Sequence, residues 1–427
     1  MDKERQEKIE SLQALYYKGD MGLVIPAAQE LVRKYQSATA VNILALAHKR
    51  QGNIDQARQI FEQVLVDNPT NTLFLGNLGN IYTDTGKLEK AEECYLNALE
   101  EDPSSIGISV SLANVYALTA RPSRALKILH QILSYKDRLT YNDLDDINFK
   151  IAEIYRDAGS DFYDKAIEHY SRSGKRLSSS LWLELIYRSK DKKTYSESEE
   201  KILKTGEVNP LLAAVQTHAS IRYKIPDRNL FCREPLSYIK LSKLSPQDGF
   251  NHDLVDKLLK SSRGFDAKPQ ELLKSGSQTS GNVFLSSDPA FRTLKTIIFQ
   301  KIEEYRSKFS ESTDGFITKW PKNSELHGWI VDMKGGGLLK PHMHKLGWLS
   351  GSLYLSLKKI SGSNAGNIVF DLKGASYPSD SKDFPSMECN ISQGDIVMFP
   401  SSLFHYTVAS EKNERRISLA FDVKPID

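Results

Sequence analysis

Residues 341–355 read Pro-His-Met-His-Lys-Leu-Gly-Trp-Leu-Ser-Gly-Ser-Leu-Tyr-Leu, and they carry the most informative pattern in the chain. His342 and His344 are two positions apart, so on a β-strand their imidazoles would share one face. A third histidine, His405, follows 61 residues after His344. Imidazoles are common ligands of divalent transition metals. The spacing therefore predicts that these three side chains form one metal site.

A basic side chain and a hydroxyl follow the third histidine. Arg416 and Ser418 come next, starting 11 residues after His405. Because they are two positions apart, they would also share a strand face, whereas Arg415 would point the other way. Arginine offers a carboxylate a fixed fork of donors, and a nearby hydroxyl can share that carboxylate. This pattern predicts a carboxylate-binding pocket beside the metal.

The composition is that of a globular protein with more than one domain. The chain has 427 residues, of which 40% are hydrophobic and 26% charged, and its formal charge is only +3. This balance gives no electrostatic reason to expect nucleic acid or membrane binding. Cys94, Cys232 and Cys389 are scattered, which suits a reducing compartment. With no signal-peptide core and no long apolar run, we expect a cytoplasmic protein.

The N-terminal half repeats with a period of 34 residues, the separation of Pro69 and Pro103, which is typical of tetratricopeptide repeats. The unit between these prolines has small residues where two helices must approach, aromatic residues to fill the gap, and Gly and Pro at the helix ends. The residues concerned are Leu78, Gly79, Tyr82, Gly86, Ala91, Tyr95, Ala98 and Pro103. Neighbouring units match more loosely, and residues 8–37 and 179–210 resemble degenerate terminal units.

Over about half of its length the chain thus resembles the tetratricopeptide-repeat family. The resemblance implies an α-solenoid with a groove for a protein or peptide partner. The same residues would also suit an array that only forms a homodimer or braces another domain. We predict a tetratricopeptide-repeat helical domain at residues 1–215.

After residue 215 the repeat stops and strand patterns begin. Residues 288–306 have the apolar spacing of a helix. Short β-branched or aromatic segments, bounded by Gly, Pro, Ser or Asp, predict strands at 329–333, 351–358, 367–372, 395–399 and 417–423. Gly335–Gly337 predicts a turn, and residues 373–390 a long loop of the kind that can cover a site. Together these patterns predict a jelly roll with flanking helices at residues 216–427.

The C-terminal half resembles the double-stranded β-helix oxygenases that depend on Fe(II) and 2-oxoglutarate, a family that includes prolyl hydroxylases. Within that family it is most similar to a group of bacterial and phage-like oxygenases. The segments that carry the resemblance are Pro-His-Met-His at 341–344, Leu-Ser-Gly-Ser-Leu-Tyr-Leu at 349–355, Gly-Asp-Ile-Val-Met-Phe-Pro-Ser at 394–401, His405, and Arg-Ile-Ser at 416–418. Gly-Ser-Gln-Thr at 276–279 also fits that group.

The family pattern is His-x-Asp/Glu, a distal His, and Arg-x-Ser. The resemblance implies that His342 and His405 bind iron, and that Arg416 and Ser418 hold the carboxylate of 2-oxoglutarate. It also makes Tyr354 a candidate hydrogen-bond partner of that carboxylate. No catalytic residue is predicted beyond the metal ligands.

This chain departs from the family pattern at the acidic ligand, where it has His344. We predict that His344 is the third ligand, because it would face the same way as His342 and three neutral imidazoles can bind Fe(II). Alternatively, His344 is the first ligand and Leu346 occupies the acidic position, which would leave room for a water.

The resemblance implies a dioxygenase that uses Fe(II), 2-oxoglutarate and O₂ to hydroxylate an unactivated C–H bond, releasing succinate and CO₂. The repeats favour a protein or peptide side chain, such as that of proline, as the substrate, and a free amino acid is a further option. Two other functions stay open. One is a repeat scaffold with a degenerate, non-catalytic oxygenase domain, and the other is a three-histidine cupin-type dioxygenase that does not use 2-oxoglutarate.

Overall fold

The computed structural model describes residues 2–134, 137, 139–268, 270–358, 362–380, 384–411 and 414–426. The chain divides into two compact units. The first comprises Met1–Lys49 and Ile54–Glu200, and the second Arg50–Asn53 and Lys201–Asp427. The domain boundary predicted between residues 215 and 216 falls inside helix α13 (Pro210–Tyr223) and stays a prediction. No helix in the described ranges has the length and apolar character needed to cross a bilayer.

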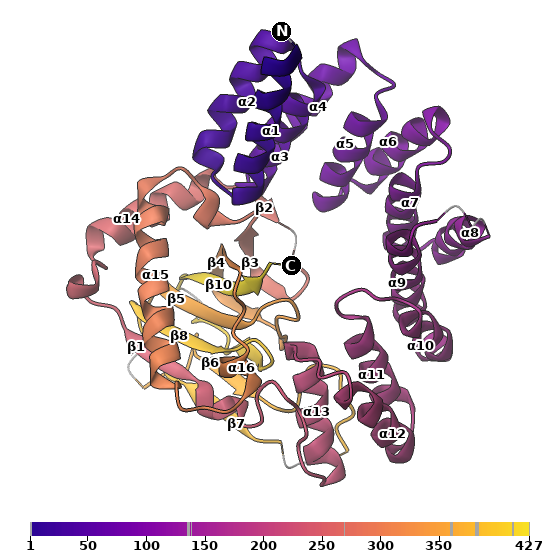
Figure 1. Ribbon diagram of the computed structural model, residues 1–427. Helices are drawn as coiled ribbons and strands as arrows, with labels where there is room; N and C mark the ends of the chain where they lie inside the picture. Colours follow the sequence, from indigo (N-terminus) through magenta and orange to yellow (C-terminus); the bar gives the residue numbers. More distant parts are fainter. Residues whose placement is uncertain are drawn as a thin grey trace. The chain divides into compact units, whose positions relative to one another are not determined.

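The first unit is built from consecutive helices, drawn from indigo to magenta in Figure 1. They are α1 (Asp2–Lys18), α2 (Met21–Tyr35), α3 (Ala38–Arg50), α4 (Ile54–Asp67), α5 (Thr72–Asp84), α6 (Leu88–Glu101), α7 (Ile106–Leu118), α8 (Pro122–Leu133), α9 (Tyr141–Asp157), α10 (Tyr163–Ser171), α11 (Ser178–Ser189) and α12 (Lys192–Leu203). Neighbouring helices pack in pairs, α5 with α6, α7 with α8 and α9 with α10. This arrangement confirms the predicted repeat array.

The repeat signature packs as its residue types predict. A Cβ atom at Gly79 would lie only 2.5 Å from Cε1 of Tyr95, so α5 and α6 approach more closely than any larger residue would allow. The Tyr95 ring is buried, and its hydroxyl donates to Oδ1 of Asn80 at 2.8 Å. Gly86 follows α5 with φ of +73°, a conformation that suits glycine at a helix end.

Replacing Gly79 with alanine should destabilise the repeats by about 1–3 kcal/mol, because the added methyl group overlaps the Tyr95 ring in a packed interior. The measurement is the midpoint of thermal unfolding, followed by far-ultraviolet circular dichroism. Gly107→Ala in α7 is the matched control, because its Cβ would meet nothing within 4 Å and alanine is the better helix former. Equal midpoints for the two variants would show that the close approach at Gly79 is unimportant.

The second unit contains α13, α14 (His252–Ser261), α15 (Pro289–Lys308), α16 (Gly315–Thr318) and antiparallel strands. The strands are β1 (Lys240–Lys243), β2 (Ala267–Lys268), β3 (Leu273–Thr279), β4 (Ser324–Leu339), β5 (Leu349–Leu357), β6 (Ile368–Asp371), β7 (Ser386–Cys389), β8 (Asp395–Pro400), β9 (Phe404–Thr407) and β10 (Arg416–Pro425). A large sheet has the order β1-β8-β5-β10-β4-β3-β2, and a small sheet the order β7-β6-β9.

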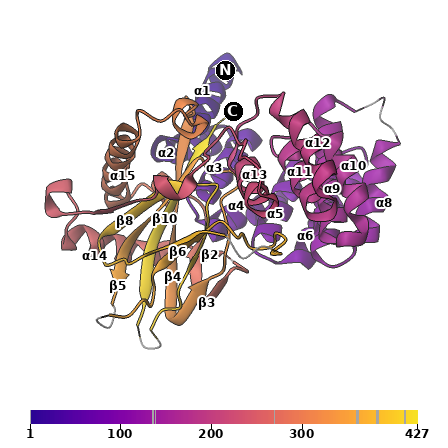
Figure 2. The same ribbon diagram turned by 90° about the horizontal axis from the view of Figure 1, so that it is seen from below.

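Two cores follow from the alternation of side chains along the strands. Helices α14 and α15 lie along one face of the large sheet, as Figure 2 shows, and pack against residues such as Leu353 and Leu419. The opposite face packs toward the small sheet through Tyr354, Phe370 and Phe399. Two packed antiparallel sheets with helices on one side confirm the predicted fold class, an α-solenoid joined in sequence to a jelly-roll domain.

Two local predictions need correction. Gly335–Gly337 lies inside β4 instead of forming a turn. Gly336 has φ of +74°, and its amide donates to the Ser410 carbonyl at 3.2 Å, so the glycines distort the strand without ending it. The loop predicted at residues 373–390 contains strand β7, which pairs with β6. None of the described residues of this segment, 373–380 and 384–390, lines the pocket described below.

Candidate metal centre

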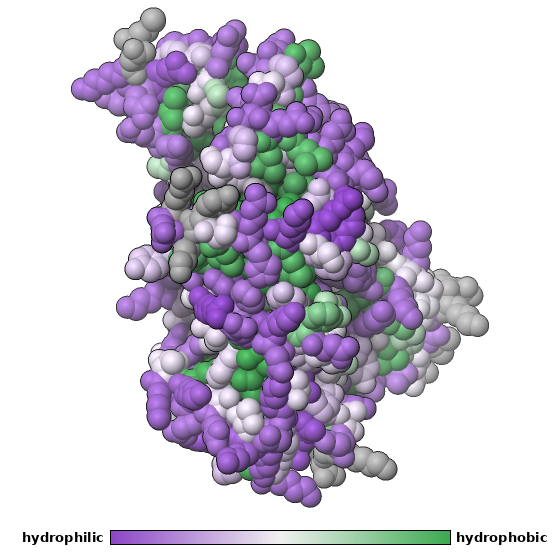
Figure 3. All heavy atoms as spheres, turned by 90° about the vertical axis from the view of Figure 1, so that its right-hand side faces the viewer, coloured by the Kyte–Doolittle hydropathy of each residue, from purple (hydrophilic) through white to green (hydrophobic). Residues whose placement is uncertain are grey.

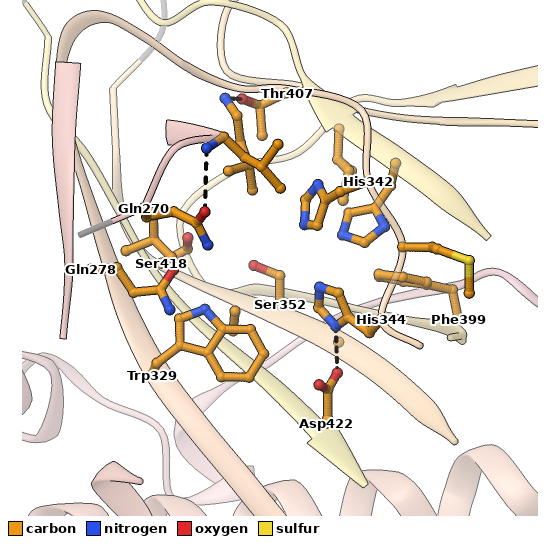
Figure 4. A pocket seen from close by; sticks show the side chains of 18 of the residues that line it. Gln270, Gln278, Trp329, His342, His344, Ser352, Phe399, Thr407, Ser418 and Asp422 are labelled. Atoms are coloured by element: carbon orange, nitrogen blue, oxygen red, sulfur yellow. Dashed lines mark hydrogen bonds and ion pairs between the residues drawn. The ribbon is translucent and has the colours of Figure 1, made fainter. Parts of the chain in front are cut away.

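Three histidine side chains meet in one pocket of the second unit. His342 and His344 belong to the segment between β4 and β5, and His405 belongs to β9. One ring nitrogen of each lies within 4.8 Å of the other two. The ring centroids are 4.3 Å apart for His342 and His405, 5.1 Å for His344 and His405, and 5.2 Å for His342 and His344. Figure 4 shows the rings of His342 and His344 at one side of the pocket, near Phe399.

The first two histidines do not lie on a regular strand, contrary to the prediction. Their segment forms only an isolated bridge, in which the His342 amide donates to the His405 carbonyl at 3.1 Å and the His405 amide to the His342 carbonyl at 2.8 Å. The His344 amide donates to the Ser401 carbonyl at 3.3 Å. These backbone bonds bring the segment to β9 and to the end of β8, which places the rings together without a strand.

The hydrogen bonds of the rings indicate which nitrogen is free for a metal. Nδ1 of His342 lies 2.8 Å from the Lys340 carbonyl, and Nδ1 of His405 lies 3.2 Å from the Leu403 carbonyl. Nδ1 of His344 lies 2.6 Å from Oδ1 of Asp422. The carbonyl and carboxylate oxygens only accept, and the Ser350 hydroxyl, 3.0 Å from Nδ1 of His344, donates to Asp422. Each Nδ1 therefore carries a proton, and Nε2 is the nitrogen available to a metal. All three rings therefore have the tautomer that a metal bound through Nε2 requires.

Burial keeps two of these rings neutral. His405 is 6% exposed, and its burial, together with the neighbouring His342 and His344, holds its pKa well below the usual range. Burial, followed by the proximity of His344, lowers the pKa of His342 to about 4. At neutral pH both rings thus keep the lone pair that a metal ligand needs.

A carboxylate that the sequence analysis missed lies directly behind His344. Asp422 on β10 is 3% exposed and accepts hydrogen bonds from His344 and from Oγ of Ser350, the latter at 2.7 Å. Burial alone would raise the pKa of Asp422, but these contacts outweigh it and the pKa lies below the usual value. The signal was present, because Asp422 lies at an even spacing from Arg416 and Ser418 and so shares their strand face.

Arg416 and Ser418 line the same pocket, which has a volume of about 380 Å³. Arg416 is 3% exposed, and in the described part of the chain no carboxylate pairs with it; Nη1 contacts Sδ of Met333 at 3.4 Å, and Nε makes no hydrogen bond. Its guanidinium carbon lies 4.9 Å from the Tyr354 ring centroid. Tyr354 packs beside Arg416 and not in the pocket wall, and its buried hydroxyl makes no hydrogen bond within the described ranges.

Three residues close in sequence or space to the proposed site differ in whether they reach the pocket. Arg415 is exposed and forms an ion pair with Asp332, with Nε 2.7 Å from Oδ1, so it points away from the pocket as predicted. Leu346 lines the pocket and is about half exposed. The His327 ring lies tilted beside that of Trp329, with ring centroids 5.9 Å apart, and is not part of the histidine cluster.

Family models match three parts of the chain. Residues 327–422 match the family described as "Putative 2OG-Fe(II) oxygenase", and residues 11–72 and 73–105 match tetratricopeptide-repeat families. The chain contains tetratricopeptide repeats and a 2OG-Fe(II) oxygenase domain. A search of curated proteins found no match.

Solved structures resemble the two parts of the chain only distantly. A tetratricopeptide repeat protein from Parabacteroides merdae is 17% identical, with a TM-score of 0.39, and the match covers 60% of this chain and 97% of that one. The structure of pilF from Pseudomonas aeruginosa is 17% identical, with a TM-score of 0.39, and the match covers 48% of this chain and 92% of that one. A prolyl-4-hydroxylase from Pseudomonas putida is 12% identical, with a TM-score of 0.32, and the match covers 44% of this chain and 93% of that one. Scores below 0.5 define no shared fold, so the assignment rests on the family models.

The side chains of the oxygenase domain fit the groups that its family name implies. Three imidazoles with free Nε2 atoms suit a divalent transition metal such as Fe(II). A buried guanidinium for which the described residues provide no carboxylate partner suits an acidic ligand, because a buried charge is costly until it is paired. The departure from the family pattern at His344 remains, and the carboxylate of Asp422 lies immediately behind it.

Proposed function

We propose that this protein is an Fe(II)- and 2-oxoglutarate-dependent dioxygenase that hydroxylates a side chain of a protein or peptide. One observation carries the proposal. Three imidazoles with free Nε2 atoms face the same pocket as the buried Arg416, which has no carboxylate partner in the described part of the chain. When bound, the metal and co-substrate would supply the oxidation of an unreactive C–H bond with O₂, while the protein supplies binding and orientation.

Each predicted site residue has a role in this proposal. His342, His344 and His405 would bind Fe(II) through Nε2. Arg416 and Ser418 would hold the distal carboxylate of 2-oxoglutarate, since both are buried and line the pocket. Tyr354 stays the candidate hydrogen-bond partner of that carboxylate.

The charges in the pocket favour a peptide over a free amino acid as the substrate. Asp422 is the single carboxylate among the described residues that line the pocket, and it is already bonded to His344 and Ser350. A free amino acid would therefore bring an ammonium group for which the pocket has no counter-charge. Peptide amides could instead bind the carboxamides of Gln270 and Gln278, which Figure 4 shows on the side opposite the histidines. A prolyl side chain remains one candidate within this class.

The repeats would bind the partner or protein substrate. A pocket of about 450 Å³ is lined by residues of α7 and α9, the first helices of two successive units. Within it, Nζ of Lys150 donates to Oδ1 of Asn114 at 3.1 Å, and Leu118 is more than half exposed. On the face shown in Figure 3, hydrophilic side chains surround small groups of apolar ones. A homodimer and a cytoplasmic location stay predictions.

Turnover tests the proposal directly. Protein incubated with Fe(II), O₂ and carboxyl-labelled 2-oxoglutarate should release labelled CO₂, because these oxygenases decarboxylate the co-substrate slowly even without a substrate to hydroxylate. Release should require Fe(II) and should be lost in His405→Ala. Iron-dependent O₂ consumption without CO₂ release would favour the cupin-type dioxygenase. A protein that neither consumes O₂ nor binds iron would be the repeat scaffold.

A further inference from the structure

Asp422 is a buried carboxylate that no described lysine or arginine side chain contacts, and Lys424 acts on it only as a more distant charge. In the described part of the chain, no lysine or arginine forms an ion pair with Asp422, and the ring nitrogen of His344, 2.6 Å away, is its counterpart. The remaining contact is neutral, from the hydroxyl of Ser350 at 2.7 Å. A buried carboxylate is costly unless its charge is compensated. A cation bound to the other nitrogen of His344 would supply that compensation.

Several side chains are arranged to hold the carboxylate against His344. Asp422 pairs in register with Ser350 on β5, and the Ser350 hydroxyl also lies 2.7 Å from that of Ser401. The segment that carries His344 passes close to this group at Gly347. A Cβ atom there would lie 2.6 Å from Oγ of Ser401 and 3.2 Å from Cγ of Asp422. A glycine is therefore needed for His344 to reach the carboxylate.

We propose that Asp422 supplies the negative charge that the acidic ligand supplies in the family pattern. This inference rests on the proposed function. Asp422 holds His344 with Nδ1–H toward itself and Nε2 toward His342 and His405. It also supplies the negative charge that the third imidazole lacks, from behind the ring instead of at the metal. Asp422 is thus a positioning residue, since its partner is His344 and not the metal or the substrate.

Metal affinity tests this role without reference to turnover. In anaerobic titrations with Fe(II), Asp422→Asn should bind about 10–100-fold more weakly than the native protein, the usual effect of losing a partner of a metal-binding histidine. Ser350→Ala is the control for the charge, because it removes a hydrogen bond to the same carboxylate and the 3.0 Å contact of the Ser350 hydroxyl with Nδ1 of His344 but keeps the negative charge. Its affinity should change much less. Native affinity in Asp422→Asn would overturn the proposal.

In a protein that already carries His344→Asp, we expect Asp422→Asn to have the opposite effect on Fe(II) affinity. In His344→Asp the family's acidic ligand is restored, but two carboxylates then lie side by side where His344 Nδ1 and Asp422 Oδ1 are now 2.6 Å apart. Like charges at this distance repel, so this variant should bind Fe(II) poorly. Adding Asp422→Asn should then strengthen binding instead of weakening it. A merely structural role for Asp422 predicts weakening, or no change, in both backgrounds.

The tautomer of His344 keeps the proposal testable if Asp422→Asn fails to fold. Nitrogen-15 shifts of the metal-free native protein, labelled at its nine histidines, should show His344 protonated at Nδ1. A ring protonated at Nε2 with no proton on Nδ1 would overturn the proposal. If the native protein binds no metal, both the proposed function and this inference are wrong. Tight binding in both the native protein and Asp422→Asn overturns the inference alone.

Discussion

His405→Ala should abolish the binding of Fe(II), with a loss of affinity well above the roughly 100-fold that changes behind a metal ligand can cause. His405 lies at the buried side of the cluster, with its ring 4.3 Å from that of His342 and 4.7 Å from that of Phe399. No other described side chain that could serve as a ligand joins the cluster, so two imidazoles would remain. The measurement is an anaerobic equilibrium titration with Fe(II).

The control for this prediction is His327→Ala. His327 is near the site but outside the histidine cluster, so its replacement should leave the iron affinity unchanged. Because alanine at position 405 leaves a cavity beside Phe399, the thermal midpoint of the metal-free variant should be measured as well. A folded His405→Ala protein that binds Fe(II) like the native chain would remove the proposed metal site.

Arg416→Ala should weaken 2-oxoglutarate binding more than 100-fold while leaving the iron affinity nearly unchanged. Removing one partner of a buried charge pair costs about 3–5 kcal/mol, and about 1.4 kcal/mol corresponds to a factor of ten. Arg416 is 3% exposed, so water cannot replace the lost donors. The measurement is a titration of the Fe(II)-loaded protein with 2-oxoglutarate. Arg416→Lys should be intermediate, because it keeps the charge but loses the fork.

Arg415 provides a matched control one residue away. It lies on the opposite face of the chain, where it is exposed and paired with Asp332. Arg415→Ala should therefore bind 2-oxoglutarate with native affinity. If Arg416→Ala and Arg415→Ala both bind it normally, Arg416 is structural, and a dioxygenase that does not use 2-oxoglutarate becomes the better explanation.

The elements that the sequence predicted are those whose signal is local. The 34-residue repeat and the close contact of Gly79 with Tyr95 depend on residues within one helix pair, and α15 shows a regular apolar spacing. Strands β1 and β3 were missed because they lie toward the edges of the large sheet and are mostly polar. Strand β9 was missed because it is only four residues long.

The candidate site was only partly readable for a related reason. Alternation along a strand tells which residues share a face, and it correctly grouped Arg416 with Ser418 and separated Arg415. It does not tell what lies opposite that face. The contact of Asp422 with His344 joins positions 78 residues apart and depends on the path of an irregular segment, which no local pattern describes.

The most direct test of the central proposal is an anaerobic titration of the native protein with Fe(II) and then 2-oxoglutarate, followed by visible absorption. We expect the charge-transfer band of an iron-bound 2-oxoglutarate chelate, and we expect His342→Ala to lack it. A native protein that binds both ligands without the band, or a band that persists in His342→Ala, would contradict the proposed site.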